Sequence, residues 1–254
     1  MRLAAATAVL NDVPAALREN PEVHSIERPA TFSQTVSEAA AFAIEAAQLV
    51  DLDGREPALF CITGTVGSSL HYFDKARESS SGRLLAPGFA RRSRRVHPFT
   101  VLLALQNQVA AELSLHFGWK GPCSSSIDSA AAFVDLLPNI ESSLEQRPAL
   151  VVMSSAAGRS EDRSWVVYQS RRQRIVSGAV ALLFEPNGRL GDVRHPTAPG
   201  SALRPDQDLF EEDLVAPQLE AGLAILWSMG RGLERARFEI GPESRQAHFE
   251  WSRE

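Results

Sequence analysis

Cysteine is scarce in this chain of 254 residues, which contains only Cys61 and Cys123. Neither has a cysteine or histidine neighbour at the spacing of a metal site, so the sequence predicts no bound metal and no disulfide framework. Both lie in apolar or small-residue segments that are typical of strands. We therefore expect a reduced, cytoplasmic protein.

The chain also lacks an excess of positive charge and any long apolar run. Its net charge of -5 argues against nucleic acid as the main partner. The apolar run at the N-terminus ends near Leu10, too early for a membrane span or a good secretion signal, and we expect no membrane partner. Gly64-Thr65-Val66-Gly67 lacks the Gly-Lys-Ser/Thr ending of a phosphate loop, and we expect no cofactor. No internal repeat occurs, so residues 1–254 are treated as one domain.

Strands are predicted to alternate with helices, which indicates an α/β protein. Apolar runs and turn residues predict strands at 2–10, 58–63, 123–128, 149–153 and 175–184. Helical spacing predicts helices at 37–52, 98–117, 129–144 (with a kink or break at Pro138) and 214–227. Residues 235–240 and 246–251 are expected to form a terminal hairpin. Residues 186–212, rich in Pro, Gly and Asp, are expected to form an irregular loop.

Four segments resemble the N-terminal region of the β-ketoacyl synthases, which belong to the thiolase-fold superfamily. In chain order they are Phe60 to Gly67, Gln106 to Pro122, Gly121 to Phe133, and Ser177 to Glu185. The resemblance covers about the first 185 residues. It implies a thiolase-like N-terminal half, with a mixed five-stranded sheet flanked by helices and extended by the C-terminal helix and hairpin.

The same resemblance bears on the catalytic nucleophile. In the family, Asp-Thr-Ala leads into a cysteine at the N-terminus of a buried helix. Here Asp128-Ser129-Ala130 matches that lead-in and Ala131 falls where the nucleophile stands, so no catalytic residue is expected. Nothing resembles the family's Gly-His-Gly-Thr-Gly-Thr segment, and only His195 and His248 follow residue 116.

A second register makes Cys123 the alternative nucleophile. Cys123-Ser124-Ser125-Ser126 is identical to the family's Cys-Ser-Ser-Ser quartet. This register removes the strand between Gly121-Pro122 and the nucleophile. It also leaves the cysteine directly after a proline, where entry into a helix is hard to build.

These features resemble the chain-length-factor proteins and imply a non-catalytic, ketosynthase-like subunit. It would pair with an active ketosynthase, or with itself, in polyketide or fatty-acid-like biosynthesis. In thiolase-fold dimers the strand after Gly-Pro pairs with its equivalent, which implies an interface formed by Cys123, Ser124, Ser125, Ser126, Ile127 and Asp128. Two alternatives stay open: an active thioester acyltransferase or condensing enzyme that uses Cys123, and a module that binds an acyl chain or a carrier protein without a synthase.

A basic run provides the candidate contact with an acyl carrier protein. It consists of Arg91, Arg92, Arg94 and Arg95. Because the protein is acidic overall, a local cluster of arginines is a candidate docking site for a negatively charged carrier.

Overall fold

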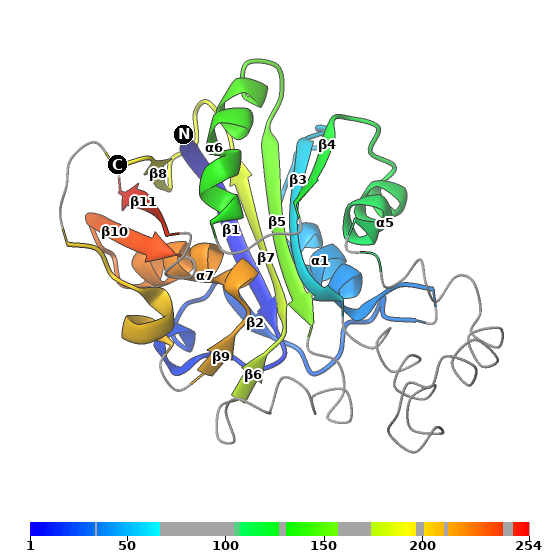
Figure 1. Cartoon of the computed structure of the whole chain (residues 1–254). Coiled ribbons are helices and arrows are strands. Elements are labelled where there is room, and N and C mark those ends of the chain that lie inside the picture. The colour runs from blue at the N-terminus through cyan, green and yellow to red at the C-terminus, as the bar shows by residue number, and fades with distance from the viewer. Residues whose placement is uncertain are drawn as a thin grey trace, which may run out of the picture.

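The computed structural model describes residues 1–33, 35–66, 105, 107–126, 131–156, 174–196, 201–210, 213–240 and 246–253. Its strands are β1 (Arg2–Leu10), β2 (Val23–Ser25), β3 (Ala58–Val66), β4 (Cys123–Ser126), β5 (Ala149–Ala156), β6 (Arg174–Val176), β7 (Gly178–Phe184), β8 (Gly191–Arg194), β9 (Asp213–Val215), β10 (Arg235–Ile240) and β11 (Ala247–Ser252). The helices are η1 (Ala15–Leu17), α1 (Glu38–Gln48), α5 (Gln108–Phe117), α6 (Ala132–Ser143), η3 (Pro205–Leu209) and α7 (Pro217–Gly230) (Figure 1).

One large sheet organises the molecule. Nine of the described strands form it, in the order β10-β11-β8-β1-β7-β5-β3-β4 with β2 paired to β1. β3 runs parallel to β4 and β5, whereas β7 runs antiparallel to both β5 and β1. The five strands β1, β7, β5, β3 and β4 thus make a mixed sheet, and β1, β3, β4 and β5 all end at one edge, called here the carboxyl edge.

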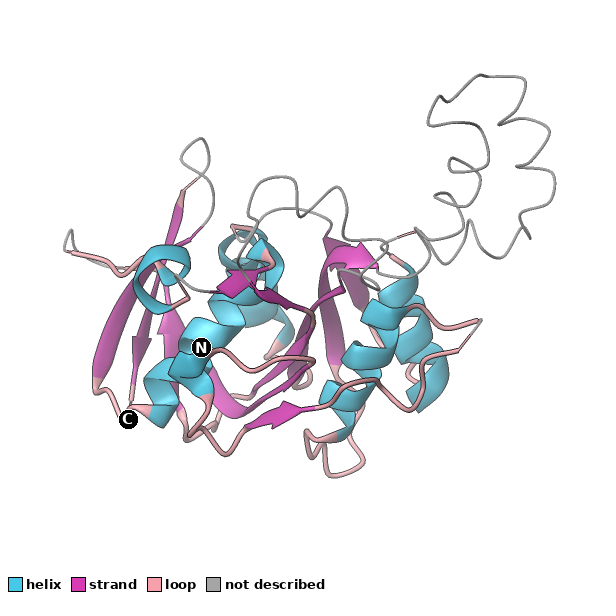
Figure 2. Ribbon diagram, turned by 90° about the horizontal axis from the view of Figure 1, so that it is seen from below, coloured by secondary structure: helices cyan, strands magenta, loops and turns pink. Residues whose placement is uncertain are grey.

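Helices cover both faces of the central strands, as Figure 2 shows. Because side chains alternate along a strand, each strand contributes to two separate cores. Phe60 and Ile62 of β3 join α6 and α7 on one face, and Leu59 and Cys61 join α1 and α5 on the other. A central sheet buried on both faces between helices confirms the predicted α/β class.

Local sequence explains where the helices begin and end. The Ser37 hydroxyl accepts a hydrogen bond from the Ala40 N–H at 3.3 Å and caps the start of α1. Pro217 occupies the first turn of α7, where its missing N–H costs nothing. α5 ends at Gly118, whose φ of 70° is the left-handed conformation of a helix C-cap.

The predicted loop at 186–212 was wrong in part, because it contains β8 and the π-helical turn η3. β8 lies between β1 and β11 and so joins the terminal hairpin to the main sheet. β8 is only four residues long, so its alternation of apolar and polar residues is too short to be recognised in a segment rich in Pro and Gly. Its pairing partners, near residues 2 and 251, lie far away in sequence.

Several other boundaries differ from prediction, among them the start of the helix predicted at 214–227, which begins at Pro217 because Asp213–Val215 form β9. α6 continues through Pro138 without a break, because Leu136, Leu137 and Ile140 hold the turns around the proline in the core. The strand predicted at 175–184 divides into β6 and β7, with Ser177 between them. β6 leaves the main sheet and pairs with β9.

Candidate functional site

The start of α6 is the first place to look for catalytic chemistry. Ala131 immediately precedes α6 and is 1% exposed, and Ala132 and Phe133 are equally buried. α6 follows β4 from the carboxyl edge and returns the chain to the start of β5. Ile127, Asp128, Ser129 and Ala130, which join β4 to α6, lie outside the described residues.

Aromatic side chains from the C-terminal hairpin pack against the first turn of α6. The Phe133 ring packs edge-on against Phe249 of β11, with 5.6 Å between ring centroids and an interplanar angle of 85°. Phe249 in turn lies 5.1 Å from Phe238 of β10. The start of α6 is therefore part of the hydrophobic core. Sequence reasoning missed this contact, because it predicted the hairpin without predicting which elements the hairpin packs against.

β4 occupies the outer edge of the main sheet, beyond β3. Cys123 lies opposite Leu59 and Ser125 opposite Cys61, which places both side chains on the α1 and α5 face. Ser124 and Ser126 face α6 and α7 by the same alternation. The Leu59 N–H donates to the Pro122 carbonyl at 2.9 Å, so the N–H groups of Cys123 and Ser125 point away from β3. No described strand pairs with this outer edge of β4.

The described surroundings of Cys123 raise the pKa of its thiol. Although the residue is exposed at the strand edge, partial burial of its thiol raises the pKa, and a hydrogen bond with Ser114 of α5 lowers it by less. Cys123 opens a strand, whereas a reactive cysteine is commonly found at a helix N-terminus or beside a cation. Cys61 is fully buried, and burial raises the pKa of its thiol well above the ordinary value.

Polar side chains gather at the carboxyl edge on the α7 side. A Cβ atom at Gly64 would lie 2.6 Å from Gln218 Oε1 and 2.7 Å from Ser155 Oγ, so the three residues meet closely. On the opposite face, Thr63 and Ser154 are paired neighbours of β3 and β5. Both are completely buried, and their hydroxyl oxygens have no hydrogen-bond partner among the described residues. Sequence reasoning did not single out Ser154, Ser155 or Gln218, because polar residues at the ends of elements are common.

The remaining predicted site residues divide into those outside and those inside the described chain. Arg91, Arg92, Arg94 and Arg95 lie outside it. His195 follows β8, and His248 of β11 lies 4.0 Å from Glu239 on the face of the hairpin that points away from α6. In the part of the chain that the structure describes, no three metal-ligating side chains gather. No helix there combines the length and apolar character that crossing a bilayer requires.

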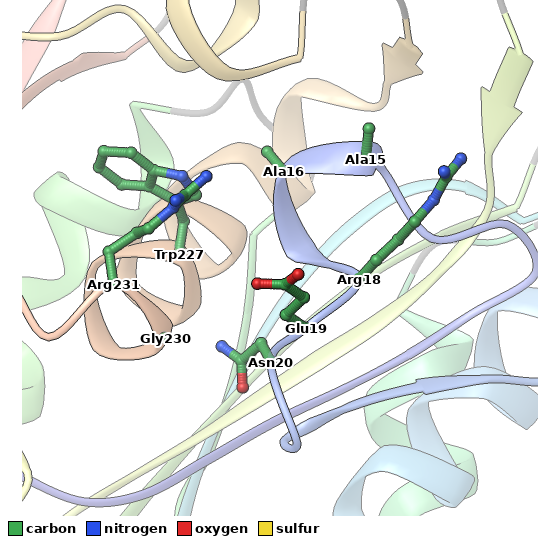
Figure 3. A pocket seen from close by; sticks show the side chains of 8 residues that line it. All are labelled: Ala15, Ala16, Arg18, Glu19, Asn20, Trp227, Gly230 and Arg231. Atoms are coloured by element: carbon green, nitrogen blue, oxygen red, sulfur yellow. The ribbon is translucent and has the colours of Figure 1, made fainter.

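A cavity of about 310 Å³ lies at the other end of α7. Figure 3 shows Trp227 and Arg231 on one side and the residues of η1 on the other. Asn20 is already engaged, since its Nδ2 donates to the Leu226 carbonyl at 2.6 Å and its Oδ1 accepts from the Glu22 N–H at 2.9 Å. Gly230 at this cavity is about 18 Å along the helix from Gln218 at the carboxyl edge. The cavity is therefore separate from the start of α6.

Comparisons with known proteins reveal similarity of fold and none of sequence. No protein-family model and no curated protein matches the chain. A ketosynthase in complex with its chain length factor from Xenorhabdus doucetiae matches with a TM-score of 0.57 and 14% identity over 100% of both chains. A type II polyketide synthase acyl-carrier protein in complex with its ketosynthase matches with a TM-score of 0.64 and 9% identity, over 100% of this chain and 99% of that one.

A β-ketoacyl synthase from Burkholderia phymatum STM815 gives a TM-score of 0.56 and 10% identity over 91% of this chain and 86% of that one. The protein thus has the thiolase-like fold of the ketosynthases and chain length factors. The likeness extends well past residue 185, where the sequence resemblance ended. At identities of 14% or less, fold similarity persists where residue patterns no longer do.

Proposed function

We propose that this protein is a non-catalytic, ketosynthase-like subunit that pairs with an active ketosynthase in polyketide or fatty-acid-like biosynthesis. The observation that carries the proposal is Ala131, a buried methyl group at the start of α6 in a ketosynthase-type fold. Condensation needs a nucleophile that attacks an acyl thioester, and a methyl group cannot supply one. The packing of Phe133 against Phe249 supports a structural role for this end of the helix.

The alternative, an acyltransferase or condensing enzyme that uses Cys123, finds less support. A nucleophilic cysteine requires a lowered pKa or an adjacent base. Here partial burial raises the pKa of Cys123, and Ser114, the side chain that hydrogen-bonds to its thiol, is not a base. Intact-protein mass spectrometry after incubation with acyl thioesters separates the two functions. A stable adduct that disappears in Cys123→Ala would favour the enzyme.

The proposed interface with the ketosynthase is centred on the open edge of β4. An unpaired strand edge readily accepts another strand, and proteins usually cover or charge such edges. Cys123, Ser124, Ser125 and Ser126 instead offer small, uncharged side chains that let a second backbone approach. Ile127 and Asp128 stay in the proposal as the continuation of this segment.

Co-expression with candidate ketosynthases tests the proposal. We expect the two chains to co-purify as a complex that condenses acyl units, with activity lost when the cysteine of the partner is replaced. Ser125→Pro removes an N–H from the open edge of β4 and should abolish the complex, whereas Ser125→Thr keeps that N–H and should preserve it. A lone monomer that affects no condensing partner would refute the proposal. If an acyl chain or a carrier protein co-purified with this protein in the absence of a ketosynthase, the result would favour the alternative of a module that binds without a synthase.

An acyl carrier protein is the second proposed partner. Binding of the carrier by Arg91, Arg92, Arg94 and Arg95 stays a prediction, because these residues lie outside the described residues. Reversing the charge of its four arginines should weaken carrier binding, and the loss should be largest at low salt because exposed charges are screened at high salt. Unchanged binding would remove this site.

A further inference from the structure

The cavity between η1 and the end of α7 lies between two elements that are tied together. The Asn20 side chain donates to the Leu226 carbonyl of α7 at 2.6 Å, and its backbone N–H donates to the Leu17 carbonyl of η1 at 3.0 Å. Leu17 is 1% exposed and belongs to the main core. Gly230 permits this close approach, since a Cβ atom there would lie 3.0 Å from Asn20 Nδ2. A buried hydrogen bond therefore anchors both sides of the cavity to the folded core.

Two oppositely charged side chains line this cavity from its two sides. Glu19 turns from the η1 side towards α7, and Arg231 comes from the end of α7 (Figure 3). Both are exposed, and neither side chain has a hydrogen bond or ion pair with another described residue. Arg18 also lines the cavity, but its side chain extends away from Trp227. One carboxylate and one guanidinium at the cavity are therefore not neutralised by each other.

The rest of the cavity lining is largely apolar. Trp227 is half-buried and packs partly against the main core. Ala15 and Ala16 line the cavity from the side of η1. The volume of about 310 Å³ is at the small end of the range for ligand pockets, which begins at about 300 Å³. The cavity thus combines an aromatic wall with one anion and one cation, in a space suited to a small molecule.

We propose that this cavity binds a small amphoteric ligand, an α-amino acid with an aromatic or large apolar side chain. The ammonium group of the ligand donates to the Glu19 carboxylate, and its carboxylate accepts from the Arg231 guanidinium, whose planar edge matches a carboxylate bidentately. The side chain of the ligand lies against Trp227. A ligand with charge of one sign leaves either Glu19 or Arg231 uncompensated, so the charges of the cavity favour a ligand that carries both.

Isothermal titration calorimetry of the full-length chain with three matched probes tests the proposal. The probes are phenylalanine, which carries both charges, phenethylamine, which lacks the carboxylate, and 3-phenylpropionate, which lacks the ammonium group. Phenylalanine should bind at least about tenfold more tightly than either analogue, because each analogue loses one charge-assisted hydrogen bond. Tryptophan and leucine are titrated as further members of the proposed class. Equal affinity for phenylalanine and its two analogues, or no binding of any of the three amino acids, would overturn the proposal.

Two single variants assign each charge of the ligand to its residue. Glu19→Gln should weaken phenylalanine binding about tenfold without weakening 3-phenylpropionate, which has no ammonium group to lose. Arg231→Gln should weaken phenylalanine to the same degree without weakening phenethylamine. Glu141→Gln and Arg189→Gln make the same changes of charge at exposed positions elsewhere and should alter affinity less than about twofold. Equal losses in these controls would contradict the assigned contacts.

The melting temperature without probe checks the fold of each variant. Because Glu19 and Arg231 are exposed and unbonded, their variants should melt at the temperature of the native chain. If both variants melted lower and bound phenylalanine like the native chain, the two side chains would pair with each other and the ligand site would be refuted. The cavity lies at the other end of α7 from the carboxyl edge, and this proposal does not depend on the proposed pairing with a ketosynthase.

Discussion

The reactivity of Cys123 follows from its place on β4. Partial burial raises the pKa of its thiol, and the Ser114 hydrogen bond opposes that shift. At neutral pH the thiolate fraction should therefore be smaller than in a free cysteine peptide, although the residue is exposed. Exposure alone does not make this cysteine a nucleophile.

We predict that iodoacetamide modifies Cys123 more slowly than it modifies a free cysteine peptide at pH 7. The rate should rise as the pH approaches the raised pKa. Ser114→Ala removes the group that lowers the pKa and should slow the reaction at pH 7 further. Peptide mass spectrometry follows the modification and distinguishes Cys123 from the buried Cys61. A faster reaction than that of the free peptide would contradict this account.

Glu250 should make stability depend on acid pH. A hydrogen bond from Arg235 lowers the pKa of its carboxyl in the folded state, so its contribution is present above its unfolded pKa of about 4.3 and is lost as the pH falls through the folded value. We predict that Glu250→Gln reduces the difference in unfolding free energy between pH 7 and pH 3, measured by urea denaturation. Glu141→Gln, at an exposed position of α6, is the control and should leave the difference nearly unchanged.

Close packing of α7 on the sheet depends on Gly222. A Cβ atom there would lie 2.7 Å from Val180 Cγ1, closer than real Cβ contacts come, and 3.2 Å from Met153 Sδ, which is a tight contact. Gly222→Ala should gain about 1 kcal/mol in helix propensity. The clash with β5 and β7 should nevertheless lower the unfolding free energy, because overpacking typically costs about 1–3 kcal/mol.

Thermal or urea denaturation measures the effect of Gly222→Ala. Ala111→Gly, at an exposed position of α5, is the matched control and should cost about 1 kcal/mol through helix propensity alone. If Gly222→Ala stabilises the protein, the contact between α7 and the sheet is looser than the distances indicate.

Pairing with a ketosynthase should slow the hydrogen exchange of backbone amides at the β4 edge of the sheet. The N–H groups of Cys123 and Ser125 point away from β3 and should exchange readily in the isolated chain. On pairing with a ketosynthase, we predict slower exchange at these two amides and little change at Leu137 in the buried middle of α6. Protection that appears elsewhere and leaves β4 unchanged would place the interface on another surface.

Binding should also stabilise the chain as a whole. A partner that binds only the folded state adds about 2.7 kcal/mol at one hundred times the dissociation constant. We therefore expect the melting temperature to rise with ketosynthase concentration for the native chain and for Ser125→Thr. It should stay constant for Ser125→Pro. A rise with Ser125→Pro equal to that of the native chain would exclude the edge of β4 as the contact.

Local patterns in the sequence determined most of the individual elements. Apolar runs located β1, β3 and β5, and helical spacing located α1 and α7 to within a few residues. The α/β class and the ketosynthase-type fold could be predicted because strands that alternate with helices, and a few glycine-containing segments, carry their signal over short stretches of chain. The roles of Ala131 and of the β4 interface stay predictions.

Only the tertiary structure decided how distant segments meet. Phe133 touches Phe249, β8 inserts between β1 and β11, and Arg194 meets Arg235 around Glu250. Periodicity reports which face of an element is apolar, but it contains no information about which distant strand will pair with it. Strand pairing over long sequence separations depends on the combined burial of many side chains, and it exists only once the whole chain has folded.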